Sequence, residues 1–357
     1  MTRARLGASL AAVAGVLLMA DRPIHAQSLS GRLAVEAIAS ASTNVRAVDD
    51  PFLIFDLVGT VRIGHGWDVV IRPWGRRRTG GDWAFEMYQL QMRYVSSTRV
   101  PFRLDAGIIS SPLGLFTLEL QPDRNPLIGG PSYYFVPLPP IDGRFDGVHL
   151  MSGGYPLGAM FSVSGTRWDA RAGMTDGTPA RPRSVFSRSR PGAEPQLVLG
   201  AGVTPATGLR LGAGFARGRY RSQITSASEP IRDPRTATVF NLEGEYAVGH
   251  TRVSGEWVRN RFQTPTGVAI ARGFNLQASH TLSPRVFAAV RATRASSPVV
   301  TAPVDVRRTS MAFDGTLGYR LTTELTLRGG YQRERGYQAV RGKNAALVSI
   351  VWAERWW

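Results

Sequence analysis

Residues 285–293 read RVFAAVRAT and residues 325–332 read LTLRGGYQ, and both runs alternate apolar with polar or small side chains. Side chains that repeat with a period of two lie on opposite faces of a β-strand. Such runs recur from about residue 29 to the end of the chain, with no helical pattern between them. A long series of these strands predicts a closed sheet whose two faces contact different surroundings.

The alternation predicts sixteen strands in a single domain, with Gly, Pro, Asn, Ser and Thr in the connections. Short connections alternate with long ones, which is typical of outer-membrane barrels with tight turns on one side and longer loops on the other. To keep this order we interpret 157–177 as one strand with a bulge near Gly165, because one inserted residue changes the face. The predicted spans are 30–41, 52–63, 67–76, 83–96, 99–110, 146–154, 157–177, 196–204, 209–221, 237–248, 251–262, 269–281, 285–296, 308–320, 325–336 and 344–355.

The first 26 residues have the pattern of a secretory signal peptide. Arg3 and Arg5 precede an apolar run, residues 6–20, which is too short to span a bilayer comfortably. We expect cleavage after Ala26, which divides the chain into a signal peptide (1–26) and an outer-membrane β-barrel (27–357). An uncleaved membrane anchor is the alternative. The remaining chain has no apolar stretch of ~18 residues, so we expect no transmembrane helix in it.

The chain is strongly basic, with a formal net charge of +17, and nearly all of the positive charge is arginine because Lys343 is the only lysine. A basic chain can bind nucleic acid, anionic headgroups or anionic solutes. An exported protein seldom meets nucleic acid, so we expect no nucleic-acid partner. The absence of cysteine excludes a disulfide scaffold.

A charge on the lipid face of a barrel costs ~2–4 kcal/mol near the bilayer midplane. We therefore expect the apolar faces to point towards lipid and the arginines to point into a water-filled lumen, which would favour anions. The alternative is that these arginines form structural ion pairs with Glu36, Asp56, Glu243, Glu245, Glu256 and Asp314. The predicted pore-lining residues are Arg62, Arg72, Arg93, Arg103, Arg171, Arg210, Arg252, Arg291 and Arg328.

The connection at 111–145 is much longer than an ordinary loop, and loops of this length are often functional. Its many Leu, Ile, Tyr and Pro residues indicate a loop that packs into the protein, and we expect it to fold into the lumen and narrow it. Its acidic side chains, Glu119, Asp123 and Asp142, would then face the arginines. The alternative is an outside loop that covers the rim or contacts another subunit.

Two further features are consistent with a membrane barrel. The loop 178–195 carries several arginines and is predicted to be an exposed basic loop that attracts anions or contacts lipopolysaccharide phosphates. Aromatic residues near the predicted strand ends, such as Trp67, Tyr94 and Trp257, are expected in interfacial girdles.

The sequence contains no recognisable catalytic or metal-binding pattern. His65 and His250 lie in predicted turns, and His280 and Ser279 point to opposite faces of a predicted strand. No serine elbow and no metal-spaced histidine pair is present. We therefore expect no enzymatic activity, no cofactor and no metal site.

The whole mature chain resembles bacterial outer-membrane porins in its pattern. The string DAGI at 105–108, the string SPLGL at 111–115 and the string DGRFDGV at 142–148 look like those of the phosphate-selective porin O/P group. The resemblance implies a sixteen-stranded barrel with a constriction loop after the fifth strand. It also implies a homotrimer, a terminal aromatic residue that is read during assembly, and small hydrophilic solutes.

The sequence thus predicts an all-β protein with one transmembrane antiparallel barrel in the cell outer membrane. We expect a porin for the passive diffusion of small anionic or neutral solutes, in contact with outer-membrane lipid and lipopolysaccharide. The alternatives are a non-conducting barrel that acts as an anchor or interaction protein, and a soluble exported all-β protein. The lack of a blade-length repeat counts against a propeller.

Overall fold

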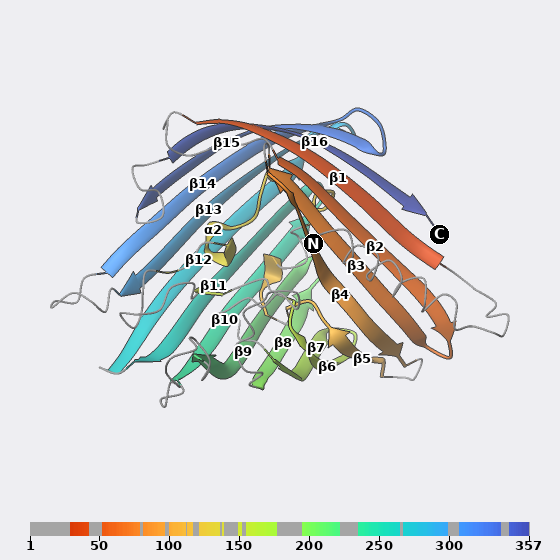
Figure 1. Cartoon of the computed structure of the whole chain (residues 1–357), viewed down its shortest axis with the longest axis vertical. Helices are drawn as coiled ribbons and strands as arrows, with labels where there is room; N and C mark the ends of the chain where they lie inside the picture. The colour runs from red at the N-terminus through yellow and green to blue at the C-terminus, as the bar shows by residue number, and fades with distance from the viewer. Residues whose placement is uncertain are drawn as a thin grey trace.

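The computed structural model describes residues 29–42, 52–78, 81–96, 100–111, 113–116, 121–135, 138, 149–151, 155–176, 195–221, 235–264, 267–298, 307–336 and 343–356. These residues form a closed antiparallel barrel of sixteen strands, in which each strand pairs with its neighbours in the sequence. β1 pairs with β16 and closes the wall (Figure 1). The prediction of a single sixteen-stranded barrel is confirmed, whereas the predicted signal peptide lies outside the described residues.

The strands have bounds close to those that the alternation predicts, apart from one region. They are β1 (Leu29–Ser42), β2 (Phe52–Gly64), β3 (Trp67–Arg78), β4 (Trp83–Val95), β5 (Phe102–Ile108), β6 (Leu157–Ser164), β7 (Trp168–Thr175), β8 (Gln196–Ala206), β9 (Leu209–Arg221), β10 (Arg235–Val248), β11 (Thr251–Thr264), β12 (Gly267–Thr281), β13 (Val286–Pro298), β14 (Arg307–Arg320), β15 (Leu325–Gly336) and β16 (Lys343–Trp356). One short helix, α2 (Ser132–Phe135), lies between β5 and β6. Among the described residues, no helix is long and apolar enough to cross a bilayer.

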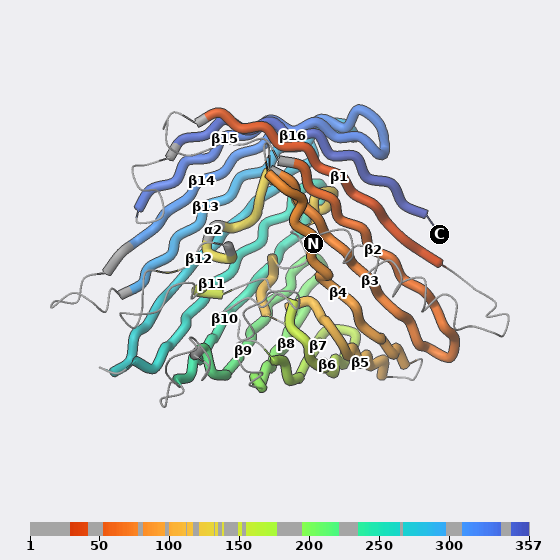
Figure 2. The backbone as a smooth tube through the Cα atoms, in the orientation of Figure 1, coloured from red at the N-terminus to blue at the C-terminus, as the bar shows by residue number. Residues whose placement is uncertain are grey.

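At one end of the barrel every connection has six residues or fewer, and all the longer connections lie at the other end, together with shorter ones such as 79–82 and 265–266. We call the end with the short connections the turn rim and the opposite end the loop rim. In the connection between β2 and β3, Gly64, His65 and Gly66 have φ values of 117°, 50° and 83°, a left-handed conformation that glycine adopts at little cost. The chain reverses sharply there (Figure 2). Gly66 also accepts a hydrogen bond of 2.8 Å from the backbone N–H of Val95, which ties this turn to β4.

The predicted strands 146–154 and 157–177 are wrong. Residues 157–177 form two strands, β6 and β7, joined by a turn in which the Gly165 N–H donates to the Trp168 carbonyl at 2.8 Å. Of the predicted strand 146–154, the described residues 149–151 are not in a strand. Ser164 pairs with Asp169 across this turn, so the outward residues change from odd to even numbers, as they would at a bulge. The alternation in 157–177 therefore could not distinguish a turn from a bulge. The two errors compensate, and the predicted count of sixteen is still correct.

The two faces of the wall differ as the alternation predicts. On β10, Phe240 and Leu242 are exposed on the outside, whereas Asn241 and Glu243 are buried on the inside. β12 repeats the pattern. Because the exposed outer side chains are apolar on strand after strand, the wall presents a broad apolar surface of the kind that contacts lipid.

The connection between β5 and β6, residues 109–156, is called the inserted segment below, and its described parts fold into the barrel. Its Leu113, Phe116 and Leu150 belong to a buried apolar cluster with inward-facing residues of the wall, among them Val198 on β8 and Phe262 on β11. In Figure 1 the segment and α2 appear in yellow, and α2 contacts β13. The predicted infolding of 111–145 is confirmed for its described parts, and the core of this protein lies between the segment and the wall.

Candidate functional site in the barrel lumen

One buried carboxylate on β11 binds the inserted segment at three points. The Glu256 carboxylate accepts hydrogen bonds from the hydroxyls of Tyr133 (2.6 Å) and Tyr134 (2.7 Å) and from the backbone N–H of Leu115 (3.3 Å). The amide of Asn241 on β10 donates to the same carboxylate at 3.3 Å. A buried carboxylate is stable when its oxygens are hydrogen-bonded in this way. Glu256 therefore holds the segment against the wall.

Arg291 on β13 binds the inserted segment from an adjoining part of the wall. Its guanidinium pairs with Asp314 on β14 at 2.8 Å and donates to the carbonyls of Gly129 (3.2 Å) and Gly130 (3.1 Å). Only 1% of the Arg291 side chain is exposed. The arginine thus neutralises a wall carboxylate and binds two backbone carbonyls of the inserted segment.

Arg328 on β15 has the same double role. It pairs with Glu36 on β1 and donates to the hydroxyl of Ser349 at 2.9 Å. It also donates to three carbonyls of the inserted segment, those of Pro122 (3.3 Å), Asn125 (2.7 Å) and Leu127 (3.2 Å). With five donors in a fixed plane, an arginine can serve several acceptors at once.

Arg72 on β3 ties the far end of the inserted segment to the wall. Its guanidinium binds both carboxylate oxygens of Asp56 on β2, at 2.8 and 2.6 Å, and donates to the Tyr155 hydroxyl at 2.8 Å. The Tyr155 ring stacks on Tyr88, with 4.2 Å between the ring centroids, and Tyr88 stacks on Trp74 at 4.8 Å. This bidentate ion pair and the stacked rings form one buried unit.

The other predicted pore-lining arginines are more open to solvent, and each has a carboxylate within 4 Å. Arg93 and Arg103 both pair with Asp105 at 2.8 Å. Arg210 bridges Asp169 (2.9 Å) and Glu243 (2.8 Å). The remaining pairs are Arg171–Glu243 (3.7 Å), Arg252–Glu245 (2.6 Å) and Arg62–Asp68 (3.5 Å).

These nine arginines therefore form two groups. The guanidiniums of Arg72, Arg291 and Arg328 are buried behind the inserted segment or beside it. The other six lie towards the turn rim and keep 26–60% of their side chains exposed. A role in lining the pore stays a prediction for all nine, and only the second group is in contact with solvent.

Of the three predicted acidic residues of the constriction, Asp123 is described, whereas Glu119 and Asp142 lie outside the described residues. Asp123 forms an ion pair with Arg32 on β1 and lies 3.9 Å from the guanidinium of Arg355 on β16. Arg32 and Arg355 stand directly opposite each other in the β1–β16 register. Asp123 therefore lies between two arginines that would otherwise repel, and it anchors the tip of the inserted segment near the turn rim.

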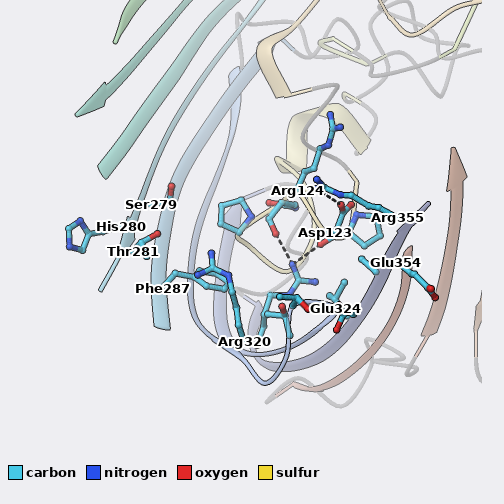
Figure 3. Close-up of a pocket in the computed structure, with 18 residues that line it drawn as sticks. Asp123, Arg124, Ser279, His280, Thr281, Phe287, Arg320, Glu324, Glu354 and Arg355 are labelled. Carbon is cyan, nitrogen blue, oxygen red and sulfur yellow. Dashed lines mark hydrogen bonds and ion pairs between the residues drawn. The ribbon is translucent and has the colours of Figure 1, made fainter. Parts of the chain in front are cut away.

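A cavity of about 820 Å³ opens beside this tip, between the inserted segment and the turn-rim ends of β12 to β16. Figure 3 shows Asp123, Arg124 and Arg355 together on one side of it, with Arg320 and Phe287 on another and His280 pointing away. The Arg320 guanidinium lies over the Phe287 ring, 5.1 Å from its centroid, and donates to the Pro284 carbonyl at 2.9 Å. Hydroxyl groups of Thr323 and Thr326 complete the polar lining.

The cavity is positively charged. Its lining includes the basic residues Arg124, Arg320, Arg328 and Arg355 and the acids Asp123, Glu324 and Glu354. Arg328 is paired with Glu36, and Glu354 lies on the opposite face of β16 from Arg355. No carboxylate among the described residues pairs with Arg124. Partial burial and, next, the charge of the nearby Arg32 lower the pKa of Arg124.

The sequence prediction did not include Arg124, Arg320 and Arg355. Arg320 and Arg355 follow the polar parity of β14 and β16 to the last inward positions, so extending the alternation to the strand ends would have found them. Arg124 has no periodic signal because it lies in the inserted segment, where only the fold brings it to the cavity.

We expected the arginines to point inward because a charge on the lipid face costs free energy, and this expectation is wrong for several strands. Arg217, Arg259, Arg272, Arg294 and Arg333 are exposed on the same parity as outward apolar residues. They lie in the loop-rim halves of their strands, and the cost of an arginine on the lipid face falls to ~0–1 kcal/mol near the membrane interface. The midplane cost is thus the wrong estimate for these positions.

No protein family and no curated protein matches this chain. Solved structures do match. OmpT of Vibrio cholerae, an outer-membrane protein, in its in-vitro folded trimer form aligns with a TM-score of 0.62 at 9% identity, covering 92% of this chain and 99% of that one. An anion-selective porin from Comamonas acidovorans gives 0.56 at 14% identity, with 92% and 99% covered. OmpF of Salmonella typhi, in complex with daunomycin, gives 0.57 at 8% identity, with 92% and 97% covered. At these identities the likeness shows a barrel fold shared with porins.

Proposed function

We propose that this protein is an outer-membrane porin that lets small hydrophilic solutes diffuse passively and mildly prefers anions. Four features support the proposal: the closed barrel, its apolar outer surface, its polar inner surface and the segment inserted into the lumen. The proposal includes export through a cleaved signal peptide and no catalytic role. Whether phosphate is favoured over other anions stays a prediction that rests on the resemblance to the O/P group.

The cavity at the turn rim is the observation that carries the proposed anion preference. It combines Arg124, Arg320 and Arg355 with only two inward carboxylates, and one of these, Asp123, already pairs with Arg32. The arginines buried elsewhere in the lumen are neutralised by their partners and contribute little to the field in the pore. A solvent-filled mouth with an excess of arginine raises the local concentration of anions.

A non-conducting barrel is the second candidate, and one observation favours it. The inserted segment is bonded to β11 through Glu256, to β13 through Arg291, to β15 through Arg328 and to β1 through Arg32. These strands form one arc of the wall, which the buried apolar cluster extends to β8, so the described parts of the segment contact a large share of the lumen wall. A barrel closed in this way would serve as an anchor or an interaction protein.

Conductance of the purified protein in a planar phosphatidylcholine bilayer separates the two candidates. A porin gives stepwise openings, and deletion of 115–140 should enlarge each step because it removes the segment from the lumen. Absence of any step in the wild type, with steps appearing only in the deletion variant, would establish the closed barrel instead. The deletion variant is first checked for barrel formation by its resistance to unfolding in detergent.

The assembly state is a further part of the proposal. The resemblance to porins implies a homotrimer, and the Vibrio cholerae OmpT structure is described as a trimer form. Mass measurement of the detergent-solubilised protein by light scattering tests this. A mass of one chain per micelle would contradict the trimer without affecting the proposed passage of solutes.

A further inference from the structure

The outer face of the barrel carries a group of arginines near the loop rim. They occupy β9, β11, β12, β13 and β15, and all of them are exposed. We call them the outer arginine belt. Its members are Arg217, Arg259, Arg261, Arg272, Arg294, Arg333 and Arg335.

The strand register makes the belt continuous. Arg259 on β11 stands directly opposite Arg272 on β12. Arg217 and Arg261 both stand opposite Thr238 on β10, one on each side of it. On the next strands, Arg294 and Arg335 both stand opposite Met311 on β14. Directly opposed residues on one face of a sheet have Cβ atoms ~4.5–5.5 Å apart, so the guanidiniums of Arg259 and Arg272 can reach a common ligand.

On β9, β11, β13 and β15 the outward residues change from apolar to basic towards the loop rim, whereas on β12 Arg272 is followed towards that rim by Ile270 and Val268. On β15 the outward residues are Leu327 and Tyr331 towards the turn rim, followed by Arg333 and Arg335 towards the loop rim. β9 has Leu211 and Phe215 before Arg217. The belt therefore lies where the apolar surface ends, at the level of the headgroups rather than of the lipid chains.

The belt lacks protein counter-ions in the part of the chain that the structure describes. None of its side chains forms an ion pair or a hydrogen bond there, whereas the nine predicted lumen arginines all have carboxylates. The inward carboxylates Glu243, Glu256 and Asp314 cannot reach it, because they lie on the other face of the wall. Like charges placed opposite each other, as Arg259 and Arg272 are, destabilise a sheet. An external anion between them would remove that repulsion.

We propose that the outer arginine belt binds the phosphate groups of lipopolysaccharide. The loop rim faces the outside of an outer membrane, because the short turns face the periplasm. Arginine pairs with phosphate through two parallel hydrogen bonds, and a row of arginines can bridge neighbouring phosphates. The belt is a lipid-binding surface distinct from the lumen, so this assignment stands whether or not the barrel conducts. It also differs from the predicted contact through 178–195, which lies outside the described residues.

The test compares two double variants that each remove two exposed arginines. R259Q/R272Q removes the opposed pair of the belt, and R167Q/R285Q removes two exposed arginines from short connections at the turn rim. Each full-length protein is purified in a neutral detergent and titrated with deep-rough lipopolysaccharide and with its dephosphorylated form. At low salt, R259Q/R272Q should weaken binding of the phosphorylated form by roughly thirtyfold, since each of the two basic residues contributes ~1 kcal/mol near an anionic surface.

R167Q/R285Q should bind like the wild type, and the dephosphorylated form should not distinguish the three proteins. Unchanged binding in R259Q/R272Q would overturn the proposal, as would an equal loss in R167Q/R285Q. Equal affinity of the wild type for phosphatidylglycerol would show that the belt binds phosphate lipids in general and would overturn the assignment to lipopolysaccharide. Thermal unfolding in detergent confirms that both variants are folded. Conductance in phosphatidylcholine should stay at the wild-type value in R259Q/R272Q, which separates a failure of this proposal from a failure of the proposed pore.

Discussion

Arg291 and Arg294 lie three residues apart on β13, and they face opposite sides of the barrel wall. Arg291 points inward, where Asp314 and two carbonyls of the inserted segment surround its guanidinium. Arg294 points outward and is exposed, with Phe274 and Met311 as its neighbours across the sheet. The same residue type is therefore a structural ion pair on one face and an unpaired surface charge on the other.

This difference indicates how the chain uses its large positive charge. The buried inner arginines are neutralised, so they hold the inserted segment and contribute little net charge to the lumen. Among the described residues, unpaired arginines gather at the cavity at the turn rim and in the outer arginine belt near the loop rim, and others, such as Arg167 and Arg285, lie singly in the turns. Net charge alone could not locate these sites, because it counts paired and unpaired arginines equally.

The largest expected effect on stability comes from replacing Arg291, the buried arginine that faces the lumen. R291Q removes the charge that pairs with buried Asp314, and breaking a buried ion pair from one side costs roughly 3–5 kcal/mol. We expect a clear fall in the urea midpoint of the barrel in detergent. R294Q should stay within about 0.5 kcal/mol of the wild type, as surface changes usually do. R291Q/D314N should recover part of the loss, and equal midpoints for R291Q and R294Q would contradict the comparison.

The next effect concerns the attachment of the inserted segment to Glu256. Y133F/Y134F removes the two hydroxyl donors while keeping both rings, and a buried acceptor left unsatisfied costs about 1–3 kcal/mol. We expect a more mobile segment, seen as increased current noise and variable step size in single-channel recordings. Y88F is the matched control, because the Tyr88 ring stacks on Tyr155 and Trp74 without a bond to Glu256. Quiet, uniform steps in Y133F/Y134F would show that these hydroxyls do not hold the segment.

A smaller effect is expected at the turn-rim cavity. R124Q/R355Q removes two solvent-exposed charges, each of which acts on a passing ion with about 1 kcal/mol or less in a watery, salt-screened mouth. The ratio of anion to cation permeability should fall by about twofold at low salt and change little in concentrated salt. R62Q/D68N, a neutral exchange of an exposed lumen pair, provides the comparison. A permeability ratio that is unaffected by R124Q/R355Q would show that the cavity does not cause the anion preference.

The smallest effect is expected for a lumen arginine that is exposed to solvent, as the outer arginines are. Arg62 pairs with Asp68 at 3.5 Å while 60% of its side chain is exposed. Exposed ion pairs contribute about 0–1 kcal/mol, so R62Q should leave the urea midpoint almost unchanged. A loss as large as that of R291Q would mean that facing the lumen, rather than burial, decides the contribution of an arginine.

The sequence predicted the barrel well because alternation is a local property. Val290 and Arg291 point to opposite faces whatever the rest of the chain does, and strand after strand repeats the rule. The division of 157–177 was missed because the Gly165 turn and a bulge produce the same change of face. The merged strand then preserved the short and long order only because 146–154 was counted as a strand.

The site was less accessible to sequence reasoning than the fold. Parity shows that Arg328 points inward, but the carbonyls of Pro122, Asn125 and Leu127 reach it from more than two hundred residues away in the chain. Arg294 follows the apolar alternation of β13, which by itself indicates an outward side chain, whereas the midplane cost of a charge favours the inward face and does not apply near the rim. The free-energy cost of a charged side chain therefore depends on its depth in the membrane as well as on the face of the wall that carries it.

The reversal potential of the purified protein in a KCl gradient tests the central claim most directly. With the protein in a neutral bilayer, we expect stepwise openings and a reversal potential with the sign of the chloride equilibrium potential. The magnitude should shrink as the salt concentration on both sides is raised, because screening weakens the unpaired arginines. A reversal potential of the sign that potassium sets, or a bilayer without openings, would contradict an anion-preferring pore.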